Sequence, residues 1–128
     1  MSTSTNAMLF FGWQVADPES TDLPCPPWLA GCGWEEEYAK RIGVGVSDPK
    51  VQKSVVEIVD HCCDSYPMYC VGIRATRTTA YRGSPETVTT TEDGRHDWNQ
   101  ELTAFCTLME LPIPPEGGTW LLASYWSG

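Results

Sequence analysis

The most reactive side-chain types of the chain lie together in one short run, in which His61, Cys62 and Cys63 are flanked by Asp60 and Asp64. Imidazole and thiolate groups bind transition metals, and a cysteine near a histidine can act as a nucleophile. The spacing favours neither role, because consecutive residues of a helix point in different directions around its axis. The two carboxylates also oppose thiolate formation. We therefore expect Cys62 to pack in the core and His61 to face solvent.

A second pair of cysteines, Cys25 and Cys32, lies in a proline-rich segment. Six residues separate them, whereas zinc sites typically have about two to four residues between such ligands. We expect two packed, reduced thiols, with a structural zinc ion or a loop disulfide as the alternatives. His61 would join them as a ligand only if the fold brought it near. No other cofactor is indicated, and the six cysteines together are more typical of reduced thiols in a cytoplasmic protein than of a disulfide framework.

Most of the arginines are concentrated in one part of the sequence. Four of the five lie between residues 74 and 95, next to His96: Arg74, Arg77, Arg82 and Arg95. Guanidinium groups suit phosphate and carboxylate, so an anion site is one interpretation, with aromatic walls from Trp28 and Trp34. Strand alternation would place Arg74 and Arg82 on one face and Arg77 on the other. Solvated ion pairs with nearby carboxylates are the competing interpretation.

Familiar enzyme motifs do not occur in the sequence. Gly43-Val44-Gly45 lacks the third glycine of a phosphate-binding loop, and neither a Gly-x-Ser-x-Gly elbow nor a His-Glu-x-x-His motif appears. This weighs against a hydrolase, an ATPase or a metalloprotease of the common kinds. The sequence leaves enzymatic activity undecided and favours a protein that is not an enzyme.

Length and charge limit the remaining classes. The 128 residues suit a single domain, which we place at residues 8–128 after a disordered leader at residues 1–7. The net charge of −9 argues against nucleic acid or an anionic membrane as the partner. No signal peptide or membrane span is indicated near the N-terminus. We expect a cytoplasmic protein.

The first half of the chain predicts a strand, a loop and two helices. Residues 8–15 alternate as in a strand, and residues 17–33 hold too many prolines and glycines for a helix or a central strand. A short helix is predicted at residues 34–42 and ends at Gly43. A second helix begins at Asp48 and Pro49 and continues to Tyr66, because its apolar residues recur at helical spacing. These residues are Val51, Val55, Ile58, Val59 and Cys62.

The second half predicts two or three strands and one helix. Residues 68–73 form a strand with two apolar faces, followed by a threonine-rich hairpin at residues 76–91 or, alternatively, a loop. A helix from Asp97 has an apolar stripe and closes at Pro112, and a last strand spans residues 119–126. The order β-α-α-β-β-α-β predicts an α+β fold, with about four antiparallel strands and two to three helices on one face. A ferredoxin-like sandwich is one arrangement with this order.

The last strand also predicts how the protein assembles. It carries Trp120, Leu122 and Trp126 on one face and Leu121 and Tyr125 on the other, so both faces need cover. We expect a homodimer through this strand or through the helix-free face of the sheet. The alternative is a monomer in which Trp28 and Leu29 of the proline-rich loop supply the cover.

Two functions follow from these patterns. The first is a small acidic binding or regulatory protein that acts through protein contacts on a basic partner, like an immunity protein or an inhibitor. The second is a small-molecule or anion-binding domain, or a small enzyme, with its pocket between the loop at residues 17–33 and the sheet.

Overall fold

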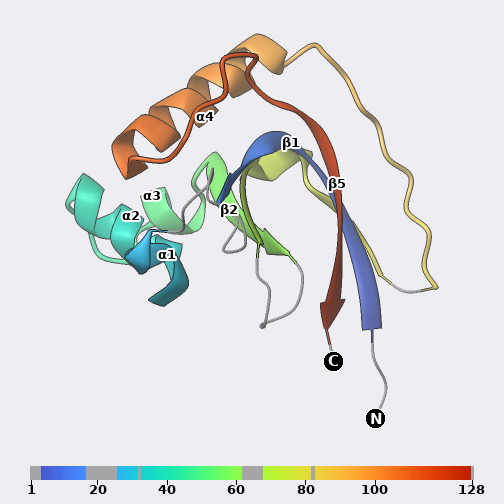
Figure 1. Cartoon of the computed structure of the whole chain (residues 1–128), viewed down its shortest axis with the longest axis horizontal. Coiled ribbons are helices and arrows are strands. Elements are labelled where there is room, and N and C mark those ends of the chain that lie inside the picture. The colour runs from blue at the N-terminus through green and yellow to red at the C-terminus, as the bar shows by residue number, and fades with distance from the viewer. Residues whose placement is uncertain (1–3, 17–25, 32, 62–67, 82, 128) are drawn as a thin grey trace.

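The computed structural model describes residues 4–16, 26–31, 33–61, 68–81 and 83–127. In this part of the chain, five strands form one antiparallel sheet and the helices lie against it (Figure 1). The elements are β1 (Ser4–Ala16), α1 (Pro27–Gly31), α2 (Trp34–Ile42), α3 (Pro49–Gln52), β2 (Val56–His61), β3 (Met68–Ile73), a 3₁₀ turn (Arg74–Thr76), β4 (Thr78–Ala80), α4 (Arg95–Met109) and β5 (Thr119–Ser127). The predicted α+β class is confirmed. No helix among the described residues has the length and apolar character that a membrane span requires.

The long strand β1 organises the sheet. It pairs with β5 along residues 4–12, and with β4 and β3 at residues 7–9 and 12–16. Because β4 and β5 both pair with residues 7–9, they lie on opposite edges of β1. Strands β3 and β4 therefore act as one interrupted strand, and the sheet is four strands wide in the order β2, β3/β4, β1, β5. This order is compatible with a ferredoxin-like sandwich.

A 3₁₀ turn held by hydrogen bonds interrupts the sheet between β3 and β4. Gly12 is opposite Gly72 and Leu9 is opposite Thr78, so three steps along β1 match six steps along its partner. The extra residues form the 3₁₀ turn. The Thr76 hydroxyl accepts a hydrogen bond from the Phe11 N–H at 3.0 Å and donates one to the Ile73 carbonyl at 2.7 Å. The hydroxyl thus replaces the backbone acceptor that the turn removes from the ladder.

The main core lies between the sheet and the helices. Alternate residues of β1, namely Phe11, Trp13 and Val15, face the helices, and α4 buries the predicted apolar stripe against them. The rings of Phe11, Trp98 and Trp120 form a cluster with centroids 5.0 to 5.9 Å apart. The predicted periodicity of α4 is therefore confirmed, although the helix begins at Arg95 rather than Asp97.

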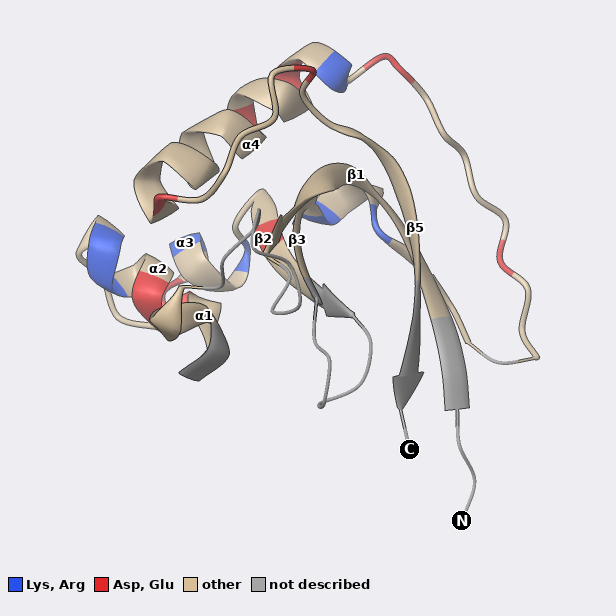
Figure 2. Cartoon of the chain, viewed as in Figure 1, with Lys and Arg blue, Asp and Glu red and all other residues tan. Residues whose placement is uncertain are grey.

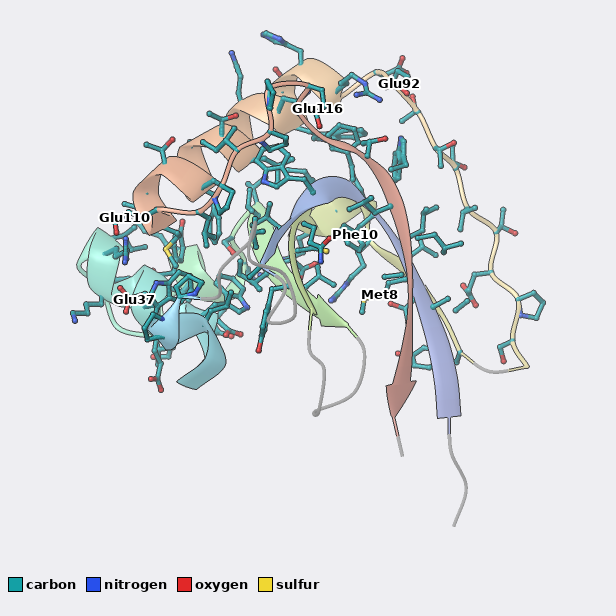
Figure 3. All side chains as sticks on the ribbon, viewed as in Figure 1. Met8, Phe10, Glu37, Glu92, Glu110 and Glu116 are labelled. Atoms are coloured by element: carbon teal, nitrogen blue, oxygen red, sulfur yellow. The ribbon has the colours of Figure 1, made fainter. Side chains whose placement is uncertain are left out.

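Helix α2 matches its predicted bounds and ends at Gly43, whose φ of 77° is left-handed. Arg41 ties it to its neighbours. Its guanidinium donates to Glu37 at 2.7 Å and to the Leu108 carbonyl at 2.8 Å, and it lies 5.8 Å from the ring centre of Trp28. Figure 3 shows the labelled side chains of Glu37 and Glu110 near this junction.

A second, smaller core occupies the other face of the sheet. It joins Met8, Phe10, Val59, Cys70 and Ala123, which come from four strands including the outermost two, β2 and β5. In a flat sheet those strands would be about 14 Å apart, three times the usual spacing. Here Cα atoms of β2 and β5 approach within 8 Å. The sheet therefore curls around this core, with Met8 and Phe10 on the side of β1 away from α4 (Figure 3).

Two glycines opposite each other in the central strands make this curl sterically accessible. A Cβ atom on Gly12 would lie 1.8 Å from the carbonyl oxygen of Val71, and one on Gly72 would lie 2.7 Å from the Phe10 ring. At Gly12 the two central backbones therefore approach each other more closely than a side chain would permit. The Phe10 ring takes the space above Gly72.

The predicted helix from Asp48 to Tyr66 is wrong beyond its first turn. Asp48 does cap a helix, since its carboxylate accepts from the Lys50 N–H at 2.8 Å, but α3 ends at Gln52. Val56 to His61 instead form β2, with Val56 and Ile58 in the main core and Val59 in the smaller one. Apolar residues on both faces of a short strand produced the apparent helical spacing.

Three other predictions need correction. The proline-rich loop contains α1, a short helix with Pro27 as its first residue, a position that proline tolerates. The threonine-rich hairpin is absent from the described residues: β4 pairs with β1, and residues 83–91 contain no strand, which agrees with the alternative prediction of a loop. Strand β1 spans Ser4–Ala16, so it is longer than the strand predicted at residues 8–15.

Candidate functional site

A buried carboxylate between two arginines is the main polar feature of the helix-free face. Glu57 lies on β2 opposite Gly72, and its side chain is only 6% exposed. Its Oε1 atom lies 3.3 Å from Arg77 Nη1 and 3.6 Å from Arg74 Nη1. Among the described residues, its Oε2 atom is buried without a hydrogen-bond partner. A buried carboxylate oxygen in this state is rare and calls for an explanation.

The 3₁₀ turn brings the two arginines together. Strand alternation alone would put Arg74 and Arg77 on opposite faces, as the sequence predicted. The turn at residues 74–76 breaks that alternation, and both guanidinium groups reach Glu57. The prediction that they diverge is therefore wrong.

Burial sets the proton affinity of this cluster. It raises the pKa of the Glu57 carboxyl, and the charges of Arg77 and Arg74 lower that pKa only in part. Both arginines are more than a third exposed, so water screens their attraction. The cluster therefore favours the protonated carboxyl more than an exposed glutamate does.

Ser54 links this cluster to a groove on the helical side. It is buried, and its carbonyl and hydroxyl oxygens accept from Arg74 at 2.9 and 3.2 Å. The hydroxyl donates in turn to the Val56 carbonyl at 2.7 Å. The groove has a volume of about 480 Å³ and lies between α2, α3, α4 and the start of β2. Its lining residues are Tyr38, Ile42, Lys50, Lys53, Ser54, Val55, Val56, Glu101, Ala104 and Phe105.

A third feature is the strand extension, which we define as residues 4–9 of β1, 78–80 of β4 and 122–127 of β5. Figure 1 shows β1 and β5 running side by side past the helices toward the chain termini. Leu122 lies opposite Leu9 in this extension and is 75% exposed. It is the most exposed large apolar side chain among the described residues.

The predicted anion-site residues do not form one site. Arg74 and Arg77 meet at Glu57, but His96 is exposed in the first turn of α4. Trp28 lies against Arg41, and Trp34 packs against Tyr38 and Phe105. Arg82 lies outside the described residues. Among the described members of the predicted group, Arg74 and Arg77 come together.

The predicted metal ligands cannot be placed. Cys25, Cys32 and the side chain of His61 lie outside the described part of the chain, as do Cys62 and Cys63. Two other cysteines, Cys70 and Cys106, are buried free thiols. Burial raises the pKa of each thiol to about 12, so neither is a nucleophile at neutral pH.

The pocket was predicted between the loop at residues 17–33 and the sheet. Residues 17–25 of that loop lie outside the described residues, and none of its described residues lines the groove. Sequence reasoning missed Glu57, Lys50 and Lys53. A carboxylate at the third position of an apolar run, Val55-Val56-Glu57-Ile58-Val59, was the available signal for a buried charge.

Comparisons with protein-family models, with curated proteins and with solved structures found no significant match.

Proposed function

We propose that this is a small cytoplasmic binding protein that regulates a partner protein by contact, as an immunity protein or an inhibitor does. The observation that carries the proposal is the strand extension, where Leu122 is 75% exposed beside the half-buried Leu9. Burying a leucine side chain is worth about 2 kcal/mol, so a partner that covers this point gains affinity there.

The backbone beside Leu122 is also available for contact. Among the described strands, β5 pairs only with β1, which leaves its outer edge open along most of its length. An open edge next to an apolar side chain is the feature by which sheets add a strand from another chain. This supports a contact through β5 rather than through the helices.

The segment at residues 83–91 adds a second contact element. Residues 83–90 are exposed, and Thr87 to Thr91 are all β-branched types that favour extended backbone. The segment leads past the sheet to α4, and the Trp120 indole donates to the Thr91 carbonyl at 3.3 Å. It is suited to pairing with a partner strand.

Charge defines the kind of partner. The net charge of −9 favours association with a basic protein and opposes binding to nucleic acid or to an anionic membrane. Acidic positions occur on α2, on α4 and along the segment before α4 (Figure 2). They would speed the encounter, whereas Leu122 and the β5 edge would slow dissociation.

The same surface supports a homodimer. The curled sheet covers its own helix-free face, so that face does not require a second subunit. The exposed part of β5 is the surface left for a dimer, and a two-fold axis through it would bury Leu122 and the strand edge of both copies with one self-complementary patch. A partner protein would then bind there only after the dimer dissociates. The dimer proposal is thus limited to the strand extension.

The test compares Leu122→Asp with Val46→Asp, a matched control at a position that is 43% exposed in the loop before α3. Light scattering at micromolar concentration should give twice the mass of 14.2 kDa for the wild type and the control, and the single mass for Leu122→Asp. A partner captured from the native host, identified and purified, should bind the control normally and bind Leu122→Asp at least about tenfold more weakly. Equal binding by both variants would refute the proposal.

A further inference from the structure

The groove between the helices and β2 has an apolar floor. Val56 and Phe105 are buried beneath it, and the Tyr38 ring stands beside Phe105 with centroids 5.3 Å apart. A volume of about 480 Å³ lies in the range of small-molecule sites. Two aromatic rings and a valine provide a wall for a flat apolar group.

Basic groups gather at one side of this groove. Lys50 and Lys53 both line it, and they stand three residues apart at α3 and its C-cap, so they share one side of the turn. Arg74 lies directly behind Ser54, a third lining residue, with its Nη2 atom 3.2 Å from the serine hydroxyl. Two of the three lysines of the chain therefore line the groove, and Arg74 contacts one of its lining residues. Figure 2 shows the basic positions of α3 close to β2.

Acidic groups also lie near the groove. Glu101 is on the α4 side of the groove and is exposed to water. Glu57 is held by Arg74 and Arg77, which together carry one more charge than it does. Asp48 caps α3 beside Lys50, and the charge of Glu35 acts on Glu57, so Lys50 and Lys53 are the basic side chains that face the groove directly.

We infer that the groove binds a free small molecule in which a carboxylate or phosphate is attached to an aromatic or branched apolar group. The anion lies beside Lys50 and Lys53, and the apolar group lies against Tyr38 and Phe105. Both the anionic group and the apolar group of the ligand contribute to affinity, because exposed lysines alone hold an anion weakly in water. The inference is independent of the proposed protein contact, since the strand extension does not line the groove.

Calorimetric titration tests the ligand class with four probes: phenyl phosphate, benzoate, inorganic phosphate and benzylammonium. Phenyl phosphate should bind at least about tenfold more tightly than inorganic phosphate, because only the former covers the apolar floor. Benzylammonium should not bind, because it brings the wrong charge. Equal binding of benzylammonium and benzoate, or no phenyl phosphate binding up to about 10 mM, would overturn the inference.

Variants locate the site. The double variant Lys50→Ala with Lys53→Ala should weaken phenyl phosphate binding about tenfold, whereas Lys40→Ala, an exposed lysine outside the groove, should change it less than about twofold. Ala104→Trp places a large ring in the groove from an exposed position of α4, so it should abolish binding while the thermal midpoint stays that of the wild type. Binding that survives Ala104→Trp, or that is equally weakened by Lys40→Ala, would place the ligand elsewhere and refute the site.

Discussion

On the face of the sheet that carries the helices, side chains from β1, β2, β3 and α4 fill the space between two layers. On the other face the sheet supplies both sides of the core, because it curls until β2 and β5 come together around Phe10. The first face is stabilised by side chains that fill the space between the sheet and the helices. The second depends on the path of the backbone, which two glycines make sterically accessible.

This difference changes which substitutions matter. A layer of helices can shift slightly to accommodate a changed side chain, whereas a close approach of two strands has no such freedom. The two faces also differ in their buried polar groups. The buried Glu57 lies on the curled face, where the sheet edge and the 3₁₀ turn bring arginines to it.

The largest expected effect comes from Gly12→Ala. The new methyl group would overlap the Val71 carbonyl oxygen, which is backbone and cannot rotate away. We expect a loss of about 5 kcal/mol in the free energy of unfolding, or failure to fold. Urea unfolding followed by tryptophan fluorescence measures it.

Gly45→Ala is the control for the glycine substitution, because a Cβ at Gly45 has no neighbour within 4 Å. Its unfolding free energy should stay within about 0.5 kcal/mol of the wild type. A Gly12→Ala protein as stable as this control would show that the two strands do not approach as closely as described.

Phe10 and Phe11 provide a direct test of the two faces. They are neighbours in β1, both are fully buried, and they point into different cores. Phe10→Ala and Phe11→Ala should each cost about 3–5 kcal/mol, because each removes a ring from closed packing. If Phe10→Ala costs less than about 1 kcal/mol, the curled face is not a true core.

Sequence patterns predicted the helical face well. The stripe on α4 and the bounds of α2 follow from regular spacing and from a glycine cap, which are local features. Sequence patterns failed at residues 53–61, which include β2, a strand with apolar side chains on both faces. A strand that is apolar on both sides loses its period of two, and Ile58 and Val59, together with the exposed Val55 that precedes the strand, then imitate a helix.

The candidate sites were less predictable than the fold. The meeting of Arg74 and Arg77 at Glu57 depends on a three-residue turn that no periodicity announces. The groove depends on how α3 is set against α4, which involves residues about 50 positions apart in sequence. Local propensity carries no information about such contacts.

Thr76→Val tests the turn that joins the two parts of the interrupted strand. Valine keeps the shape but removes the oxygen that accepts the Phe11 N–H, so that donor is left unpaired. We expect a loss of about 2 kcal/mol. Thr79→Val in β4 is the control and should be close to neutral, since valine favours strands. Equal stability of the two variants would show that the Thr76 hydroxyl is dispensable.

The smallest expected effect is a pH dependence from Glu57. Burial raises its pKa in the folded protein, so above the unfolded value of about 4.3 the folded state holds more of this proton than the unfolded state. The stability that the protonated carboxyl contributes is complete below that pH and declines as the pH rises through the folded pKa. Glutamine stays neutral throughout.

The unfolding free energy of Glu57→Gln minus that of the wild type should therefore rise with pH across this window, by at most about 1.4 kcal/mol per unit, and then level off. Glu36→Gln, at an exposed position of α2, should give a difference that changes little with pH. A difference for Glu57→Gln that falls with pH would mean that attraction by the arginines outweighs burial. In an Arg77→Gln background the rise should extend to higher pH, because the charge of Arg77 lowers the pKa of Glu57.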